Sequence, residues 1–475
     1  MKHSRMKRSR MKRSRKVWTC MGLLAAACAA GVYAWLPPEE PTNPSWSGAA
    51  TCEAGEDQPL GDPPAVLTQT SPKDPVSASP FLEWKKDTDA VVYEVEFFTH
   101  EPLMLSEDEP SKQAAYRTRE VYTHVYNPPL AKIAGDDLGK EPLYWRVRSI
   151  GFDGEPVSRW SPAYALYVDP ALPGEQAPRP LAMYQHGRGQ TLLYPVYSWA
   201  GLYGAESYEA AVYAENPEAD PAAKPIEVLP TNMSEIYDPK PRIGRYYWRV
   251  RALDGHHRPI GNWSRVMTYQ ALPEDNWQVA VLGDSISHGG GHYSFNPADF
   301  EFSWLSYLDF DALNLSESGD LSSMTLARFD ADVLPFHPKY LMIFTGTNSL
   351  RAGENPDKVI EDLETMREKA LQHGIRPILL TLPPINPDAI AHVFAEPTAD
   401  DWQDRFAAVN AYIRTKPHID IAAAFETPDG ILPLAMALDG LHEDVEGKKK
   451  IAQVVNRDWA AAAAAADQEM KEQER

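Results

Sequence analysis

Residues 278–286 read Gln-Val-Ala-Val-Leu-Gly-Asp-Ser-Ile, a short apolar run that ends in a turn-forming sequence. An uninterrupted apolar run of this length is typical of a strand that is buried on both faces of a parallel sheet. Four similar runs follow, and we expect them to be strands as well: 312–315, 340–345, 377–382 and 419–422. Segments with helical periodicity lie between them. This alternation predicts a parallel sheet that is covered by helices on both faces.

The clearest of the expected helices begins at Pro356 and ends before Gly374. Proline near the first turn and glycine just past the last turn are the usual boundaries of a helix. Its apolar residues recur on one face, which we interpret as core: Val359, Leu363, Met366 and Ala370.

Four local patterns fall near the C-terminal ends of the expected strands, where ligands bind in sheets of this type. They are Gly283-Asp284-Ser285-Ile286, Gly319, Gly346-Thr347-Asn348 and Asp439-Gly440-Leu441-His442. A serine becomes a nucleophile when a base takes its proton, and an aspartate three residues before a histidine can orient that base. A glycine N–H and a neutral amide can both donate to a developing oxyanion. Each pattern alone is more often a turn or a cap, but the four together predict an acyl-transfer site.

These four motifs resemble those of the SGNH (GDSL-like) hydrolase family, which is named for serine, glycine, asparagine and histidine in four separate motifs. The resemblance covers roughly residues 276–460, and we place the domain at residues 276–462. It implies an α/β/α flavodoxin-like fold. Ser285 would be the nucleophile, His442 the base and Asp439 the carboxylate that orients the base.

The same resemblance implies an oxyanion hole formed by the backbone N–H groups of Ser285 and Gly319 and by the side chain of Asn348. Two further residues, His288 and His292, flank a run of three glycines near the nucleophile. We consider them candidate pocket residues, although histidines in loops are more often simply solvated. The chemistry requires no metal, and no cofactor is indicated.

The middle of the chain contains an internal repeat. Residues 143–148, Leu-Tyr-Trp-Arg-Val-Arg, recur as residues 246–251, Tyr-Tyr-Trp-Arg-Val-Arg. The tryptophan and the Tyr-Glu pair in residues 84–94 recur in residues 199–209 at a larger offset. The first unit therefore has extra residues between its two halves, and we place them in the acidic stretch 106–111. Two offsets kept by widely spaced aromatic residues indicate a duplicated module.

Each unit has the alternation of a strand, with Trp248 and Val250 on one face and Arg249 and Arg251 on the other. The strand is followed in both units by an Asp-Gly turn and a Trp-Ser pair, a pattern that resembles fibronectin type III domains of bacterial exported proteins. We therefore expect two β-sandwich domains, at residues 65–170 and 175–272. We interpret their tryptophans as core residues; a platform for stacking sugars is the alternative.

The N-terminus combines a basic stretch with an apolar one. Residues 1–16 hold nine Lys or Arg and no acid, and residues 17–36 carry no charge. We expect residues 1–36 to be an inner-membrane anchor or a signal peptide, with the body in the periplasm or outside. The alternatives are a secreted protein and a lipoprotein attached at Cys28. Residues 37–64 have the composition of a linker.

The composition of the body excludes several classes of function. The chain carries a net charge of −21 although its first 16 residues are strongly basic, which argues against binding to nucleic acid. Its three cysteines, two of them in the apolar N-terminal run, provide neither a disulfide framework nor a cysteine-rich metal site.

At the C-terminal end of the chain, we expect a final helix from about residue 444 and a polar tail at residues 463–475.

Together these features predict an exported, membrane-anchored serine esterase that acts on acylated carbohydrate or lipid of the cell envelope. One alternative is an SGNH-type O-acyltransferase, which would pass the acyl group to an exopolysaccharide instead of water. Another is a non-catalytic adhesion protein whose sandwich domains bind a protein or glycan partner. The motif residues needed for catalysis are all present, which favours an enzyme.

Overall fold

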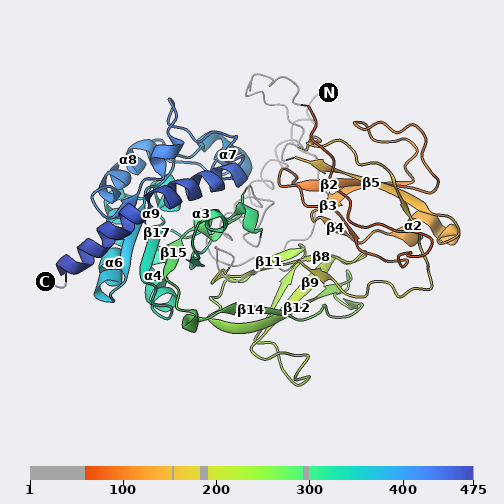
Figure 1. Ribbon diagram of the computed structural model, residues 1–475, viewed down its shortest axis with the longest axis horizontal. Helices are drawn as coiled ribbons and strands as arrows, with labels where there is room; N and C mark the ends of the chain where they lie inside the picture. The colour runs from red at the N-terminus through yellow and green to blue at the C-terminus, as the bar shows by residue number, and fades with distance from the viewer. Residues whose placement is uncertain (1–58, 152–153, 182–190, 292–298, 474–475) are drawn as a thin grey trace, which may run out of the picture.

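The computed structural model describes residues 59–151, 154–181, 191–291 and 299–473, which form two sheet-rich domains followed by an α/β domain (Figure 1). The expected N-terminal anchor or signal peptide lies outside these residues, as does most of the expected linker. Among the helices within the described ranges, none is both long enough and apolar enough to cross a bilayer.

Residues 59–64, which we had assigned to the linker, belong to the first domain. The Gly61 N–H donates to the carbonyl oxygen of Val157 at 2.9 Å, and the Gly61 carbonyl accepts from the Arg159 N–H at 3.0 Å. Pro64 is buried. Because these backbone groups pair with the domain instead of with solvent, the boundary lies earlier than residue 64.

The first domain consists of two antiparallel sheets around one core. The larger sheet has the order β3-β2-β5-β6, and the smaller one pairs β1 with β4. The strands are β1 (Leu82–Glu83), β2 (Val92–Phe98), β3 (Tyr116–Val121), β4 (Val125–Tyr126), β5 (Leu143–Ile150) and β6 (Tyr164–Leu166). Trp84 and Trp145 lie fully buried in this core, so their interpretation as packing residues is confirmed.

The second domain repeats this arrangement. One sheet has the order β10-β9-β12-β13, with β14 also paired to β12, and the other has the order β11-β8-β7. The strands are β7 (Arg179–Pro180), β8 (Val196–Ala200), β9 (Ser207–Tyr213), β10 (Glu227–Thr231), β11 (Glu235–Tyr237), β12 (Gly244–Leu253), β13 (Pro259–Ile260) and β14 (Met267–Ala271). Trp199 and Trp248 are fully buried, like their counterparts in the first domain. A fibronectin type III assignment of the two domains stays a prediction.

The extra residues of the first unit lie mainly after the acidic stretch, so our placement of them was wrong in large part. The β3–β5 connection carries β4, α2 (Leu130–Ala134) and the 3₁₀ turn η1 (Gly135–Asp137). The corresponding β10–β12 connection carries only β11. The loops that contain the acidic stretch and its counterpart, residues 99–115 and 214–226, differ much less in length.

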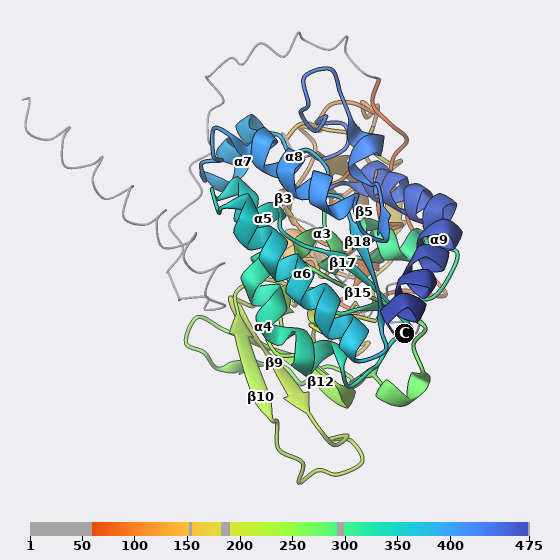
Figure 2. The ribbon, with the colours of Figure 1, turned by 90° about the vertical axis from the view of Figure 1, so that its left-hand side faces the viewer.

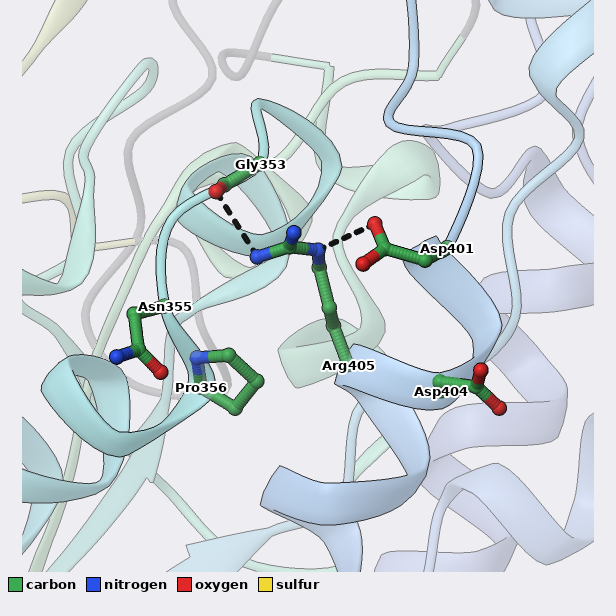
Figure 3. Close-up of a pocket in the computed structure, with 6 residues that line it drawn as sticks. All are labelled: Gly353, Asn355, Pro356, Asp401, Asp404 and Arg405. Carbon is green, nitrogen blue, oxygen red and sulfur yellow. Dashed lines mark hydrogen bonds and ion pairs between the residues drawn. The ribbon is translucent and has the colours of Figure 1, made fainter.

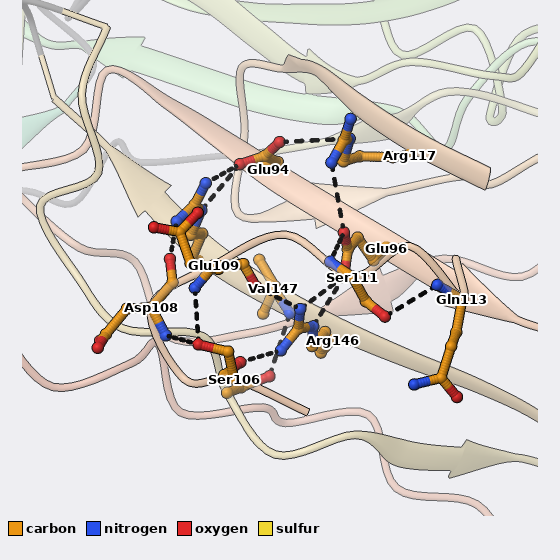
Figure 4. Close-up of polar contacts among 12 residues, drawn as sticks. Glu94, Glu96, Ser106, Asp108, Glu109, Ser111, Gln113, Arg117, Arg146 and Val147 are labelled. Carbon is orange, nitrogen blue, oxygen red and sulfur yellow. Dashed lines mark hydrogen bonds and ion pairs between the residues drawn. The ribbon is translucent and has the colours of Figure 1, made fainter. Parts of the chain in front are cut away.

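The acidic stretch has a packing role, which Figure 4 shows. The guanidinium of the buried Arg146 donates to the carbonyl oxygens of Ser106 at 2.6 Å and Glu109 at 3.0 Å, and its Nε donates to Glu96 at 2.8 Å. The same guanidinium lies over the Trp160 ring, 4.3 Å from the centroid. A buried arginine requires such acceptors, and the loop supplies them.

The C-terminal domain contains the expected parallel sheet. Its strand order is β16-β15-β17-β18-β19, and every neighbouring pair is parallel. The strands are β15 (Val279–Gly283), β16 (Leu313–Asn314), β17 (Tyr340–Phe344), β18 (Arg376–Leu380) and β19 (His418–Ile419). After β15 the chain forms β16 on one side of this strand and then β17 on the other side. The loops after β15, β16 and β17 therefore meet at a switch point of the topology, where a ligand site is expected.

Helices cover both faces of this sheet. Helices α4 (Ser322–Val333), α6 (Pro356–Gln372) and α8 (Trp402–Ile413) pack side by side on one face, and α9 (Val445–Gln473) lies on the other (Figure 2). The four apolar residues predicted for the core face of α6 are all buried. The remaining helices are α3 (Ser285–His288), α5 (Thr347–Arg351) and α7 (Pro387–Phe394), and the 3₁₀ turns are η2 (Pro273–Asp275), η3 (Phe300–Phe302), η4 (Trp304–Tyr307) and η5 (Ala422–Phe425).

The expected polar tail at residues 463–475 was wrong, because α9 continues to Gln473. Ala466 and Met470 are buried in the last turns of the helix. Asp467 binds Arg376 on the neighbouring strand β18. These contacts give the polar segment a packed side, which its composition alone did not reveal.

Candidate active site

The turn between β15 and α3 presents Ser285 at the C-terminal edge of the sheet. Ser285 is the first residue of α3, and the side chain of Asp284 caps this helix by accepting from the Ile286 N–H at 3.1 Å. A helix that starts directly after a buried strand forces a sharp turn, which leaves the serine side chain accessible at its outer end. Ser285 retains 9% of its surface exposed, while Asp284 is fully buried.

His442 connects Ser285 with Asp439. Its Nε2 lies 2.8 Å from the Ser285 Oγ, and its Nδ1 lies 2.8 Å from the Asp439 Oδ2. The other carboxylate oxygen of Asp439 accepts from the backbone N–H groups of Leu441 at 2.8 Å and of His442 at 2.7 Å. With the Nδ1 proton directed to Asp439, Nε2 can accept the Ser285 proton. Three residues that are distant in sequence thus form the arrangement expected of a nucleophile, a base and an orienting carboxylate.

The electrostatics keep Asp439 ionised. Burial alone would raise the pKa of this carboxyl, but His442 and the two backbone N–H groups hold the pKa below its usual value. An ionised Asp439 stabilises the imidazolium that forms when His442 takes a proton. The ring of Phe394 lies edge-on against His442, 5.9 Å between centroids, and limits how far the imidazole can turn.

Gly319 lies on the loop after β16 and Asn348 in the first turn of α5, and the two segments are tied together beside the nucleophile. The Asn348 Nδ2 donates to the carbonyl oxygen of Asp320 at 3.1 Å, which leaves its second N–H for a ligand. Gly319 has φ of +90°, a conformation that other residues rarely adopt, and it is exposed. The neighbouring Glu317 N–H donates to the Gly283 carbonyl oxygen at 3.1 Å. The structure thus brings both predicted donors to the strand end that carries Ser285.

Arg328 on α4 holds this region together, and the sequence analysis did not identify it. Its guanidinium donates to the carbonyl oxygen of Gly283 at 2.9 Å and to Asp320 at 2.7 Å. It also pairs with Asp332, one helical turn later, at 2.9 Å. The Arg-x-x-x-Asp spacing was available in the sequence, but it is also that of an ordinary surface ion pair. Only the fold shows that this pair is buried behind the nucleophile.

His288 does not line a pocket, so that part of the site prediction was wrong. Its side chain is fully buried, and both ring nitrogens are engaged, Nδ1 with the Ser318 Oγ at 2.8 Å and Nε2 with the Tyr194 carbonyl oxygen at 2.7 Å. Burial lowers the pKa of His288 to about 4, so the ring is neutral. His288 is the last residue of α3, three residues after Ser285, and its side chain is buried in the protein. His292 lies outside the described residues.

A second group of buried charges lies directly behind the site. Lys448 on α9 donates to the Ile286 carbonyl oxygen at 2.8 Å, and its Nζ lies 3.6 Å from the Glu443 carboxylate. Both side chains are fully buried. Burial raises the pKa of the Asp284 carboxyl to about 7. Lys448 and Asp284 thus both bind the backbone of the nucleophile helix α3 at Ile286.

No group of three or more histidine, cysteine, aspartate or glutamate side chains suited to a metal occurs within the described ranges.

A surface pocket lies between the N-terminal ends of α6 and α8 (Figure 3). Arg405 crosses it and donates to Asp401 and to the Gly353 carbonyl oxygen. None of the residues that line this pocket belongs to the Ser285 site, and we assign no function to it.

Comparison with known families agrees with this geometry. Residues 281–450 match the GDSL-like Lipase/Acylhydrolase family. The C-terminal part of the chain therefore forms a GDSL-like domain, and the enzyme class that the site supports is a serine hydrolase acting on esters.

Individual relatives cover only part of the chain. An uncharacterized lipoprotein, YqeF, of Bacillus subtilis (strain 168) is 32% identical over 119 residues, which are 22% of this chain and 49% of that protein. The match thus spans about half the length of that relative. A putative acylhydrolase of Bacteroides fragilis is 21% identical, with a TM-score of 0.31 over 40% of this chain and 87% of the other. A lipase/acylhydrolase of Enterococcus faecalis is 22% identical, with a TM-score of 0.30 over 38% and 94%.

Proposed function

Starting from a GDSL-like domain that acts on esters, we propose that the whole chain is an exported carboxylic-ester hydrolase of the cell envelope, with acylated carbohydrate or lipid as its substrate. The observation that carries the enzymatic part is the continuous hydrogen-bonded series from Ser285 through His442 to Asp439. Such a series has a specific chemical use, and a domain that only binds a partner would not need it.

The reaction would proceed through an acyl-enzyme. Ser285 Oγ attacks the ester carbonyl carbon while His442 Nε2 takes the hydroxyl proton, and the carbonyl oxygen becomes an oxyanion. The backbone N–H groups of Ser285 and Gly319 and the Asn348 amide donate to this oxygen, each contributing on the order of 10²-fold to the rate. His442 then gives its proton to the leaving alcohol. Water, deprotonated by His442, attacks the acyl-enzyme and releases the acid.

Export is supported by the N-terminal residues. A basic stretch before an uncharged one of twenty residues suits an anchor with the body in the periplasm or outside, and the linker that follows would separate the body from the membrane. The Bacillus subtilis relative is named a lipoprotein, which favours a location in the envelope. The two sheet-rich domains, which we propose to be of the fibronectin type III class, would contact a glycan or protein partner there.

Labelling with a fluorophosphonate probe and turnover of an ester panel test this proposal. The full chain should be labelled, and it should release acetate from acetylated oligosaccharide and from a chromogenic acetyl ester. Ser285→Ala should abolish both reactions. Transfer of acetate to an added sugar, without release to water, would identify an O-acyltransferase instead. Failure of the wild-type protein to react with probe and esters alike would overturn the enzymatic proposal.

A further inference from the structure

The second sheet-rich domain is joined to the edge of the catalytic sheet. The Leu193 N–H donates to the Asn314 carbonyl oxygen at 2.8 Å, and the Asn314 N–H donates to the Thr191 carbonyl oxygen at 3.1 Å. The segment before β8 therefore pairs with β16 through an isolated parallel bridge between Leu192 and Asn314. The Asn314 side chain in turn donates to the carbonyl oxygens of Ser287 at 2.7 Å and His288 at 3.2 Å. One residue thus links the second domain to the helix that carries the nucleophile.

Tyr194, which follows this bridge, contacts the catalytic domain in two ways. Its carbonyl oxygen accepts from the His288 Nε2 at 2.7 Å, and its hydroxyl donates to the Asp332 carboxylate at 2.7 Å. The other nitrogen of His288 binds Ser318, the residue before Gly319. The second domain is thereby connected through a single imidazole to the loop that supplies an oxyanion donor.

Tyr237 on β11 contacts the same loop. Its ring packs edge-on against His288, 5.6 Å between centroids, and its hydroxyl donates to the Glu317 carboxylate at 2.9 Å. Glu317 also binds the end of β15 through its backbone N–H. The loop from Glu317 to Asp320 is therefore held on one side by Asn348 of the catalytic domain and on the other side by the second domain.

The charges explain why donors from outside the catalytic domain are needed. Three carboxylates surround the Arg328 guanidinium, with Asp320 at 2.7 Å, Asp332 at 2.9 Å and Glu317 at 3.6 Å. One cation cannot satisfy three carboxylates that are removed from water. The hydroxyls of Tyr194 and Tyr237 each donate to one of them, and both hydroxyls belong to the second domain.

We propose that Tyr194 and Tyr237 are positioning residues for the oxyanion loop, which is the loop from Glu317 to Asp320. The second sheet-rich domain is then a required part of the catalytic unit. This inference rests on the proposed acyl-transfer function of Ser285. A rate-enhancing donor acts only when it lies within a few tenths of an ångström of the developing oxyanion. A loop whose supporting carboxylate has lost its partner would hold Gly319 less accurately.

The test compares three Tyr→Phe variants of the full chain. Tyr194→Phe and Tyr237→Phe each remove a hydroxyl that reaches the catalytic domain. Tyr197→Phe is the matched control, because its buried hydroxyl donates to Asp238 at 2.9 Å within the second domain. For each protein, kcat and KM on p-nitrophenyl acetate, the rate of fluorophosphonate labelling of Ser285 and the urea midpoint of unfolding would be measured.

We expect Tyr237→Phe and Tyr194→Phe to lower kcat about tenfold with KM changed less than about twofold, the signature of a lost transition-state contribution. Tyr197→Phe should lower the urea midpoint by a similar amount and leave kcat within about twofold. Equal kcat values in all three variants would overturn the inference. A wild-type protein that is labelled but hydrolyses no ester would refute the proposed function alone. The labelling rates of the three variants would then still test the inference, because labelling of Ser285 also depends on the oxyanion loop. A protein that is not labelled would refute both.

Discussion

Arg351 Nε lies 3.1 Å from the Oδ1 of Asn348 and donates to it. This bond fixes which way the amide faces, because the oxygen is held by a donor and the nitrogen is left for acceptors. It also polarises the amide, which makes its N–H groups stronger donors. The Arg351 guanidinium also forms an ion pair with Glu396 at 2.9 Å. Arg351 therefore supports the oxyanion hole through Asn348 and does not face the hole directly.

Replacement of this cation should therefore weaken catalysis. We expect Arg351→Met to lower kcat about tenfold, less than the ~10²–10³-fold loss that removal of an oxyanion donor itself by Asn348→Ala would cause. Steady-state kinetics on a chromogenic acetyl ester would measure both. The control is Glu396→Gln, which weakens the ion pair of Arg351 but leaves its bond to Asn348. An equal loss in Glu396→Gln would show that the charge pair matters and the amide contact does not.

The second prediction concerns the tautomer of His442. In Asp439→Asn, the amide oxygen can still accept from the Leu441 and His442 N–H groups, but the amide nitrogen would donate to His442 Nδ1. The proton of the neutral ring would then lie on Nε2, which could no longer accept from Ser285. We expect kcat to fall on the order of 10⁴-fold with little change in the urea midpoint.

Asp429 provides the matched control for this substitution. It too precedes a glycine, and its Oδ1 also accepts from the N–H two residues later, at 3.2 Å, but it lies at the surface. Asp429→Asn should retain the wild-type kcat. If both variants kept full activity, Asp439 would have no part in orienting the base.

Much of the catalytic domain could be predicted from its sequence, because strand, turn and helix signals there are local. The β15 run, the α6 periodicity and the four motifs each depend on residues close together in the chain. The convergence of Ser285, Asp439 and His442 followed from their places in the parallel sheet, with Ser285 directly after its first strand, β15, and the Asp-x-x-His pair in the connection from its last strand, β19, to the final helix. Local signals of this kind suffice when one topology brings strand ends together.

The supporting contacts could not be predicted, because they depend on pairs that only the fold brings together. His288 looks like a loop histidine in the sequence, yet a carbonyl of the second domain, 94 residues away, makes it a buried structural group. Lys448 looks like one of three solvated lysines, yet it faces the nucleophile helix. The sequence of α9 beyond Asp467 is polar, and its ordering depends on Arg376 of a neighbouring strand.

The third prediction follows from the pKa of Asp284, which burial raises from an ordinary value of 3.8 to about 7 in the folded protein. Between these pH values the folded state binds a proton that the unfolded state has lost. Stability therefore falls as pH rises from about 4 to about 7, by at most about 4 kcal/mol from this group. Asp284→Asn, which retains the capping oxygen, should remove that loss. The difference in unfolding free energy between variant and wild type should grow in favour of the variant from pH 4 to pH 8 in urea titrations. A difference that is constant with pH would contradict the prediction.

The last prediction concerns the buried pair of Lys448 and Glu443. Both carboxylate oxygens of Glu443 lack a hydrogen bond within the described residues, so the cation 3.6 Å away is what compensates its charge. Lys448→Met would leave that charge buried alone and should cost about 3–5 kcal/mol of unfolding free energy. Adding Glu443→Leu should recover most of this loss, because a buried ion pair and an apolar pair of similar volume are nearly equal in stability.

Lys449→Met is the control for this pair, since the adjacent Lys449 is half-exposed and its ion pair with Glu446, at 2.7 Å, lies at the surface. It should change the unfolding free energy by less than about 0.5 kcal/mol. Urea unfolding of the two single variants, the double variant and the control gives the coupling energy directly. If Lys448→Met and the double variant were equally destabilised, the loss would come from the bond to the Ile286 carbonyl, and the charge pair would contribute nothing to the support of the nucleophile helix.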